Sequence, residues 1–138
     1  MVEAHAETGG CMVAAMEVAP KKTSSYGVLD IAEDNASIVK VKGMVEKPKP
    51  EDAPSNLAIV GRYLFTPAIF DAIEQVQPGV GGEIQLTDAI ALLIEEGHPV
   101  HVVVHRGSRH DLGNPGGYLK AAVDFALDRD DYGPDLRR

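Results

Sequence analysis

An almost unbroken apolar run lies near the beginning of the sequence, at Cys11-Met12-Val13-Ala14-Ala15-Met16-Glu17-Val18. A run of this kind is typical of a strand that is covered on both faces. Apolar or alternating patterns predict four more strands, at residues 26–31, 38–45, 57–65 and 100–104. We expect the chain to turn at Glu33-Asp34-Asn35, between the second and third of these five strands.

Helical patterns alternate with the strands. One helix is expected at residues 67–76, and a second begins at Thr87, whose hydroxyl is a typical N-cap. A third is expected to follow the turn at residues 111–114. Interleaved strands and helices predict an α/β layered fold with a largely buried sheet.

Composition narrows the possible partners. The chain has 138 residues, 44% of them hydrophobic, which predicts one folded domain over residues 1–138 with a charged tail at 128–138 that frays. Its formal net charge of -8 excludes a nucleic-acid partner, which needs a basic surface, but a single phosphate needs only one lysine or arginine. No apolar stretch approaches the ~18 residues that cross a bilayer. With Cys11 expected to be a buried thiol, we expect a cytoplasmic protein without membrane contact.

Two glycines lie in predicted strands, where glycine weakens the strand and its presence requires an explanation. Gly27 is at the beginning of a strand, where it either lets backbone approach a ligand or only eases a turn. Gly61 interrupts an apolar strand, which indicates either a bulge or close approach by a ligand. Local sequence leaves both alternatives open.

A carboxylate and an ammonium group stand side by side at the end of the third predicted strand, in Val45-Glu46-Lys47-Pro48-Lys49-Pro50. Successive strand residues point to opposite faces unless the strand bends, so Pro48 affects where both side chains aim. Lys47 is a compact charge suited to a phosphate, and Glu46 can accept hydrogen bonds from several hydroxyls. The pair fits a phosphorylated sugar; the alternative is an ordinary solvated charge run.

Asp111 follows the last predicted strand, within Ser108-Arg109-His110-Asp111-Leu112-Gly113-Asn114. A carboxylate in a tight turn could be a ligand for Mg²⁺, or it could cap the following helix. The histidines lack the arrangement of a zinc site, and neither G-x-x-x-x-G-K-[ST] nor G-x-G-x-x-G occurs. We therefore expect no triphosphate cradle in this chain.

Taken in order, these segments resemble the C-terminal half of bacterial UTP–glucose-1-phosphate uridylyltransferases. The resemblance covers residues 9–127. It rests on Tyr26-Gly27-Val28, Gly43-Met44-Val45-Glu46-Lys47-Pro48-Lys49, Ala53-Pro54-Ser55-Asn56-Leu57-Ala58-Ile59-Val60-Gly61-Arg62-Tyr63, Gly82-Glu83-Ile84-Gln85-Leu86-Thr87-Asp88-Ala89-Ile90, and His110-Asp111 with Gly113-Asn114.

The resemblance implies a Rossmann-like nucleotidyltransferase fold with a mixed sheet, and an enzyme that makes UDP-glucose and pyrophosphate from UTP and glucose-1-phosphate. It implies that Lys47 is the catalytic residue that holds the sugar phosphate and that Glu46 holds the glucose hydroxyls. Three further residues would line the sugar pocket: Gly27, Val60 and Gly61. Asp111 would bind Mg²⁺, and the full-length family would form homo-oligomers.

The G-x-G-T-R and P-K-E-M motifs of the family's N-terminal half do not occur in this sequence. We therefore expect a truncated chain that meets UTP only through the missing half and is inactive on its own, and whose first strand exposes an unpaired edge. Two alternatives remain open. One is a non-catalytic module that binds the full-length enzyme, and the other is half of a pyrophosphorylase for another sugar nucleotide.

Overall fold

The computed structural model describes residues 1–32 and 38–138, and these fall into two compact units, Met1–Arg106 and Gly107–Arg138. The turn that we predicted at Glu33-Asp34-Asn35 lies outside the described residues. The sequence predicted one domain over residues 1–138.

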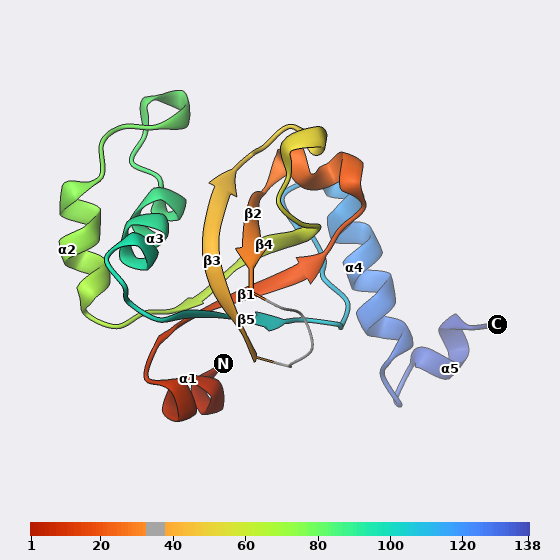
Figure 1. Cartoon of the computed structure of the whole chain (residues 1–138). Helices are drawn as coiled ribbons and strands as arrows, with labels where there is room; N and C mark the ends of the chain where they lie inside the picture. The colour runs from red at the N-terminus through yellow and green to blue at the C-terminus, as the bar shows by residue number, and fades with distance from the viewer. Residues whose placement is uncertain (33–37) are drawn as a thin grey trace. The chain divides into compact units, whose positions relative to one another are not determined.

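The described residues of the first unit form five strands (Figure 1). All five begin and end within one residue of the positions that the apolar patterns predicted. They are β1 (Cys11–Glu17), β2 (Gly27–Ile31), β3 (Ile38–Glu46), β4 (Leu57–Leu64) and β5 (Val100–Val104). Short 3-10 turns at Pro20–Ser25, Pro50–Asp52 and Val80–Gly82 lie in the connections.

The strands form a mixed sheet that closes on itself in the order β1-β4-β2-β3-β5. β1 pairs with β5 in parallel and with β4 antiparallel, whereas β3 pairs antiparallel with both β2 and β5. The circle is completed by a single pair between β2 and β4, Val28 with Ala58. Our expectation of an unpaired edge on the first strand was therefore wrong, because β1 has a strand on each side. Closure removes the edge through which strands of different chains pair.

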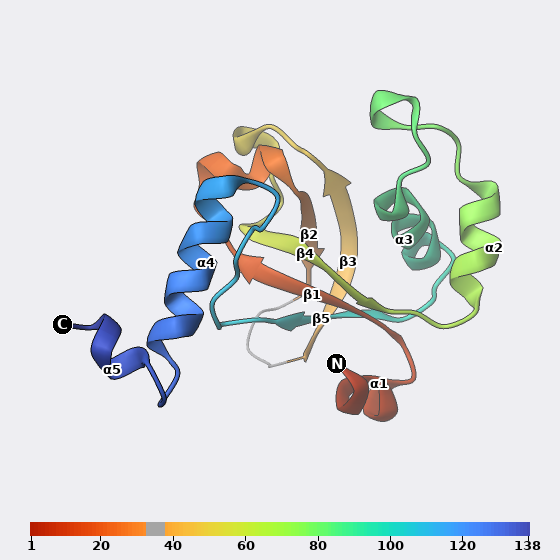
Figure 2. The ribbon, with the colours of Figure 1, turned by 180° about the vertical axis from the view of Figure 1, so that it is seen from behind.

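Two helices supply the apolar cover of this sheet, α2 (Ala68–Gln75) and α3 (Leu86–Glu95). In both views α3 lies between β3 and α2 (Figures 1 and 2). Ile90 and Leu93 of α3 are fully buried and belong to one core cluster with Val13 of β1. A further helix, α1 (Val2–Thr8), precedes β1 and ends at Gly9. The core therefore holds α3 firmly over β3.

A bulge in β4 answers the question raised by Gly61. Val13 of β1 faces Tyr63, and Ala15 faces Ile59, so three residues of β4 stand opposite one of β1. Gly61 has φ of 72°, in the left-handed region that favours glycine, and a Cβ there would have no atom within 4 Å. Backbone conformation therefore requires this glycine, as the bulge interpretation predicted.

The second unit contains α4 (Pro115–Leu127) and α5 (Gly133–Leu136). Asn114 caps α4, since its side chain accepts a hydrogen bond of 2.7 Å from the Gly117 amide. Within residues 128–138, the tail that we expected to fray, residues Gly133–Leu136 form α5. Gly133 allows this, because a Cβ at that position would lie 2.5 Å from the Leu127 carbonyl oxygen. None of the helices in the described part of the chain is both long and apolar enough to span a membrane.

Candidate functional site

A polar hollow of about 280 Å³ opens in the first unit, where β2, β3 and β4 meet the beginning of α3. Three of the residues predicted from the sequence line it: Gly27, Glu46 and Gly61. These residues come from three different strands, so the fold assembles them. The other lining residues are Ser25, Tyr26, Ile59, Tyr63, Gln85, Leu86 and Thr87.

The atoms around Gly27 leave no room for a side chain at this position. It stands opposite Glu46 in the β2–β3 ladder. A Cβ at Gly27 would lie 2.9 Å from Ile59 Cδ1 and 3.0 Å from Glu46 Oε2, both too close for ordinary contact. The space that this glycine leaves is thus occupied by the side chains of its neighbours, and in particular by the carboxylate of the site.

Glu46 has a hydrogen-bond partner that the sequence did not reveal. The Thr87 hydroxyl donates to Glu46 Oε2 at 2.8 Å, and the Glu46 side chain is only 15% exposed. We predicted that Thr87 caps a helix, and this was wrong. Thr87 is the second residue of α3, and the N-cap is Gln85, which makes no side-chain cap. Its hydroxyl serves the carboxylate instead of the helix terminus.

Lys47 leaves the strand in a left-handed conformation, with φ of 47°. Its amide donates to the Tyr26 carbonyl at 2.9 Å, which holds the turn in place. The turn ends the alternation of the strand, so Lys47 and Glu46 can reach each other, with 3.9 Å between Nζ and Oε1. Such a long contact to a half-exposed ammonium is weak. Lys47 therefore stands beside the carboxylate of the hollow with its charge available to a ligand.

Tyr63 also lines the hollow. From the sequence, an aromatic residue in an apolar strand is expected to be part of the core. Its ring stacks on Phe65 at a centroid distance of 5.2 Å. Burial, and then the negative charge of Glu46, raises the pKa of Tyr63 above its usual value. The phenol of Tyr63 therefore stays neutral at neutral pH. Val60, which we predicted in the sugar pocket, is partly buried on β4 and is not one of the hollow's lining residues.

Asp111 lies in the second unit, in the turn before α4. Its Oδ1 accepts a hydrogen bond of 2.9 Å from the Gly113 amide, and the residue is exposed. Asp111 therefore closes an Asx-type turn with Gly113, but the alternative that it caps the following helix was wrong, because the cap on α4 is Asn114. Because the Gly113 amide occupies Oδ1, the Asp111 carboxylate could bind a hard cation through its other oxygen, as one ligand. Within residues 1–32 and 38–138, no cluster of three or more His, Cys, Asp or Glu side chains could hold a metal.

Comparison with known proteins gives a consistent picture. The model of the nucleotidyl transferase family matches residues 1–127. A UTP–glucose-1-phosphate uridylyltransferase of Pseudomonas aeruginosa is 48% identical over 121 residues, which are 88% of this chain. One of Streptococcus pyogenes is 42% identical over 140 residues, 99% of this chain.

Solved structures that are similar to this chain include enzymes of the same kind. A UDP-glucose pyrophosphorylase in complex with UDP-glucose superposes on 94% of this chain with a TM-score of 0.85 and 36% identity. The UTP-bound enzyme of Acinetobacter baumannii covers 99% of this chain, also with a TM-score of 0.85, at 31% identity. The chain spans between 43% and 48% of the length of these four proteins.

Proposed function

The chain belongs to the nucleotidyl transferase family, and we propose that it supplies the sugar-phosphate site of a UTP–glucose-1-phosphate uridylyltransferase. One observation carries the proposal. Gly27, Glu46 and Gly61, from three strands, line one polar hollow, and the Lys47 ammonium stands beside its carboxylate. A carboxylate for hydroxyls next to a cation for phosphate is the pairing that a sugar phosphate requires.

In the proposed reaction, an oxygen of the glucose-1-phosphate phosphate group attacks the α-phosphorus of UTP. A new phosphorus–oxygen bond forms, the bond to the bridging oxygen breaks, and pyrophosphate leaves with that electron pair. Lys47 binds the attacking phosphate and offsets its negative charge, which would otherwise repel the triphosphate. Glu46 accepts hydrogen bonds from the sugar hydroxyls. These residues therefore act by position and charge rather than by covalent chemistry.

The wider proposal includes the rest of the enzyme. We propose that the chain corresponds to the C-terminal half of such a protein and that UTP binds mainly to the other half, in the cytoplasm and within a homo-oligomer. Asp111 is the residue here that would hold Mg²⁺, which when bound supplies charge neutralisation at the phosphates. The chain covers 43% and 45% of the length of two relatives, which supports a correspondence to about half of such a protein.

Isothermal titration calorimetry on the purified chain tests the proposal. We expect saturable binding of α-D-glucose-1-phosphate that is tighter than binding of glucose or of inorganic phosphate alone, because only the sugar phosphate engages both Glu46 and Lys47. UTP is expected to bind more weakly than the sugar phosphate. Tighter binding of UTP, or no saturable heat with the sugar phosphate, would contradict the proposal.

A further inference from the structure

We infer that Thr87 is a positioning residue for the sugar site, whose hydroxyl holds the Glu46 carboxylate so that one of its two oxygens is kept for a sugar hydroxyl. The inference rests on the proposed function and adds a residue that contacts the carboxylate rather than the ligand. It assigns a different partner to each oxygen of Glu46.

The two carboxylate oxygens have different surroundings. Oε2 accepts the Thr87 hydrogen bond at 2.8 Å and also faces the space beside Gly27. Oε1 is the oxygen nearest to Lys47 Nζ, at 3.9 Å. The inner oxygen is thus bound to the protein, whereas the outer one lies on the side of the ammonium group that would hold the phosphate.

A glutamate needs such a constraint. The terminal torsion of a glutamate side chain is broad, so a carboxylate without a fixed partner samples many orientations. A hydrogen bond to a charged group is shorter and roughly twice as strong as one between neutral groups. Because Thr87 itself is only 7% exposed and belongs to the first turn of α3, its hydroxyl is held in place by the core. One fixed donor therefore selects one orientation of the acceptor.

The space around the pair is closed as well. A Cβ at Gly27 would lie 3.4 Å from Thr87 Oγ1, as well as 3.0 Å from Glu46 Oε2. Three elements that are distant in sequence, β2, β3 and α3, therefore converge on one hydrogen bond. Such an arrangement orients the Glu46 carboxylate before the sugar phosphate binds, which lowers the entropy lost on binding.

The test uses two variants of the full chain. Thr87→Val keeps the shape of the side chain and removes the hydroxyl, whereas Thr87→Ser keeps the hydroxyl. We expect Thr87→Val to weaken glucose-1-phosphate binding about tenfold in calorimetry, while the affinity for inorganic phosphate stays within about twofold. Thr87→Ser should recover most of the sugar-phosphate affinity. Loss of both ligands in parallel, or no loss in Thr87→Val, overturns the inference.

A second measurement needs no ligand. In a double-mutant cycle of Thr87→Val and Glu46→Ala, chemical unfolding should show coupling equivalent to about a fivefold change in the folding equilibrium constant. Absence of coupling overturns the inference whatever the binding data show. If the cycle shows coupling but the wild-type chain does not bind the sugar phosphate, the proposed function is contradicted and Thr87 has only a structural role. The failure of the inference and the failure of the proposed function are therefore distinguishable.

Discussion

The Thr87 hydroxyl and the Glu46 carboxylate lie 2.8 Å apart, although 41 residues separate them in the sequence. Thr87 is placed by the packing of α3 on β3, and Glu46 by its pairing with Gly27 across the β2–β3 ladder. The geometry of the site therefore depends on the core beneath it. Substitutions at the site are expected to divide into those that remove a ligand contact and those that disturb this support.

Lys47→Ala belongs to the first kind. If the ammonium binds the sugar phosphate, its loss removes a charge-assisted hydrogen bond of roughly 1.5–3 kcal/mol. The affinity for glucose-1-phosphate should then fall by about ten- to a hundred-fold. Lys49→Ala is the matched control, because Lys49 is an exposed charge two residues further along the chain. Titration of both variants decides the matter, and equal effects would place the phosphate elsewhere.

Gly27→Ala belongs to the second kind. The new methyl would lie 2.9 Å from Ile59 Cδ1 and 3.0 Å from Glu46 Oε2, so both neighbours must move. We expect the free energy of unfolding to fall by about 1–3 kcal/mol, and sugar-phosphate binding to weaken with it. Gly43→Ala, on β3, is the control. Its Cβ would lie 4.0 Å from the nearest atom, so urea unfolding should show it to be neutral or slightly stabilising. The same loss in both variants would mean that strand propensity, and not the clash, is responsible.

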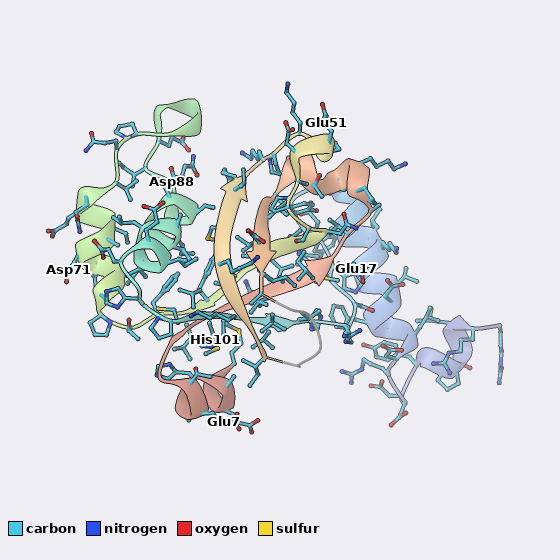
Figure 3. The ribbon with its side chains drawn as sticks, viewed as in Figure 1. Glu7, Glu17, Glu51, Asp71, Asp88 and His101 are labelled. Carbon is cyan, nitrogen blue, oxygen red and sulfur yellow. The ribbon has the colours of Figure 1, made fainter. Side chains whose placement is uncertain are left out.

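His101 on β5 (Figure 3) should make stability depend on pH. Burial, and then the positive charge of Lys40, lowers the pKa of His101 below its usual 6.5, and its buried Nδ1 has no hydrogen-bond partner within the described residues. Between the folded and the unfolded pKa, the unfolded chain binds more protons. The contribution of neutral His101 to the free energy of unfolding is therefore complete above pH 6.5. It is lost as the pH falls through the pKa of His101 in the folded chain.

Urea unfolding between about pH 5 and about pH 8, roughly 1.5 pH units either side of the unperturbed pKa, checks this expectation. The wild-type chain should lose stability toward the acid end, and His101→Gln, which has no titrating ring, should lose less. Identical pH profiles for the two chains would show that other groups govern the dependence.

Much of this fold was predictable, because each strand has its own apolar pattern. The closure of the sheet was not, since it depends on one pair, Val28 with Ala58, that no local period encodes. The apolar run of β1 correctly indicated a covered strand, but it could not identify β4 and β5 as the neighbours on its two sides.

The site was predictable to a similar degree. Glu46 and Gly27 could be singled out because they lie at strand ends, where the sites of α/β proteins are usually built, and both line the hollow. Thr87 did not, because a threonine at the start of a helical pattern is usually a cap. Tyr63 was hidden by a strand in which an aromatic residue is expected in the core. Both become recognisable only once the long-range packing is known.

The central claim is that the hollow around Glu46 and Thr87 binds a sugar phosphate. Amide chemical shifts of the ¹⁵N-labelled chain, recorded while α-D-glucose-1-phosphate is added, test it most directly. We predict saturable shifts that are largest at Gly27, Lys47 and Thr87, and that are much smaller at Gly27 and Thr87 of Lys47→Ala at the same subsaturating ligand concentrations. Shifts centred on residues 115–136 instead, or no saturable shift at all, would contradict the claim.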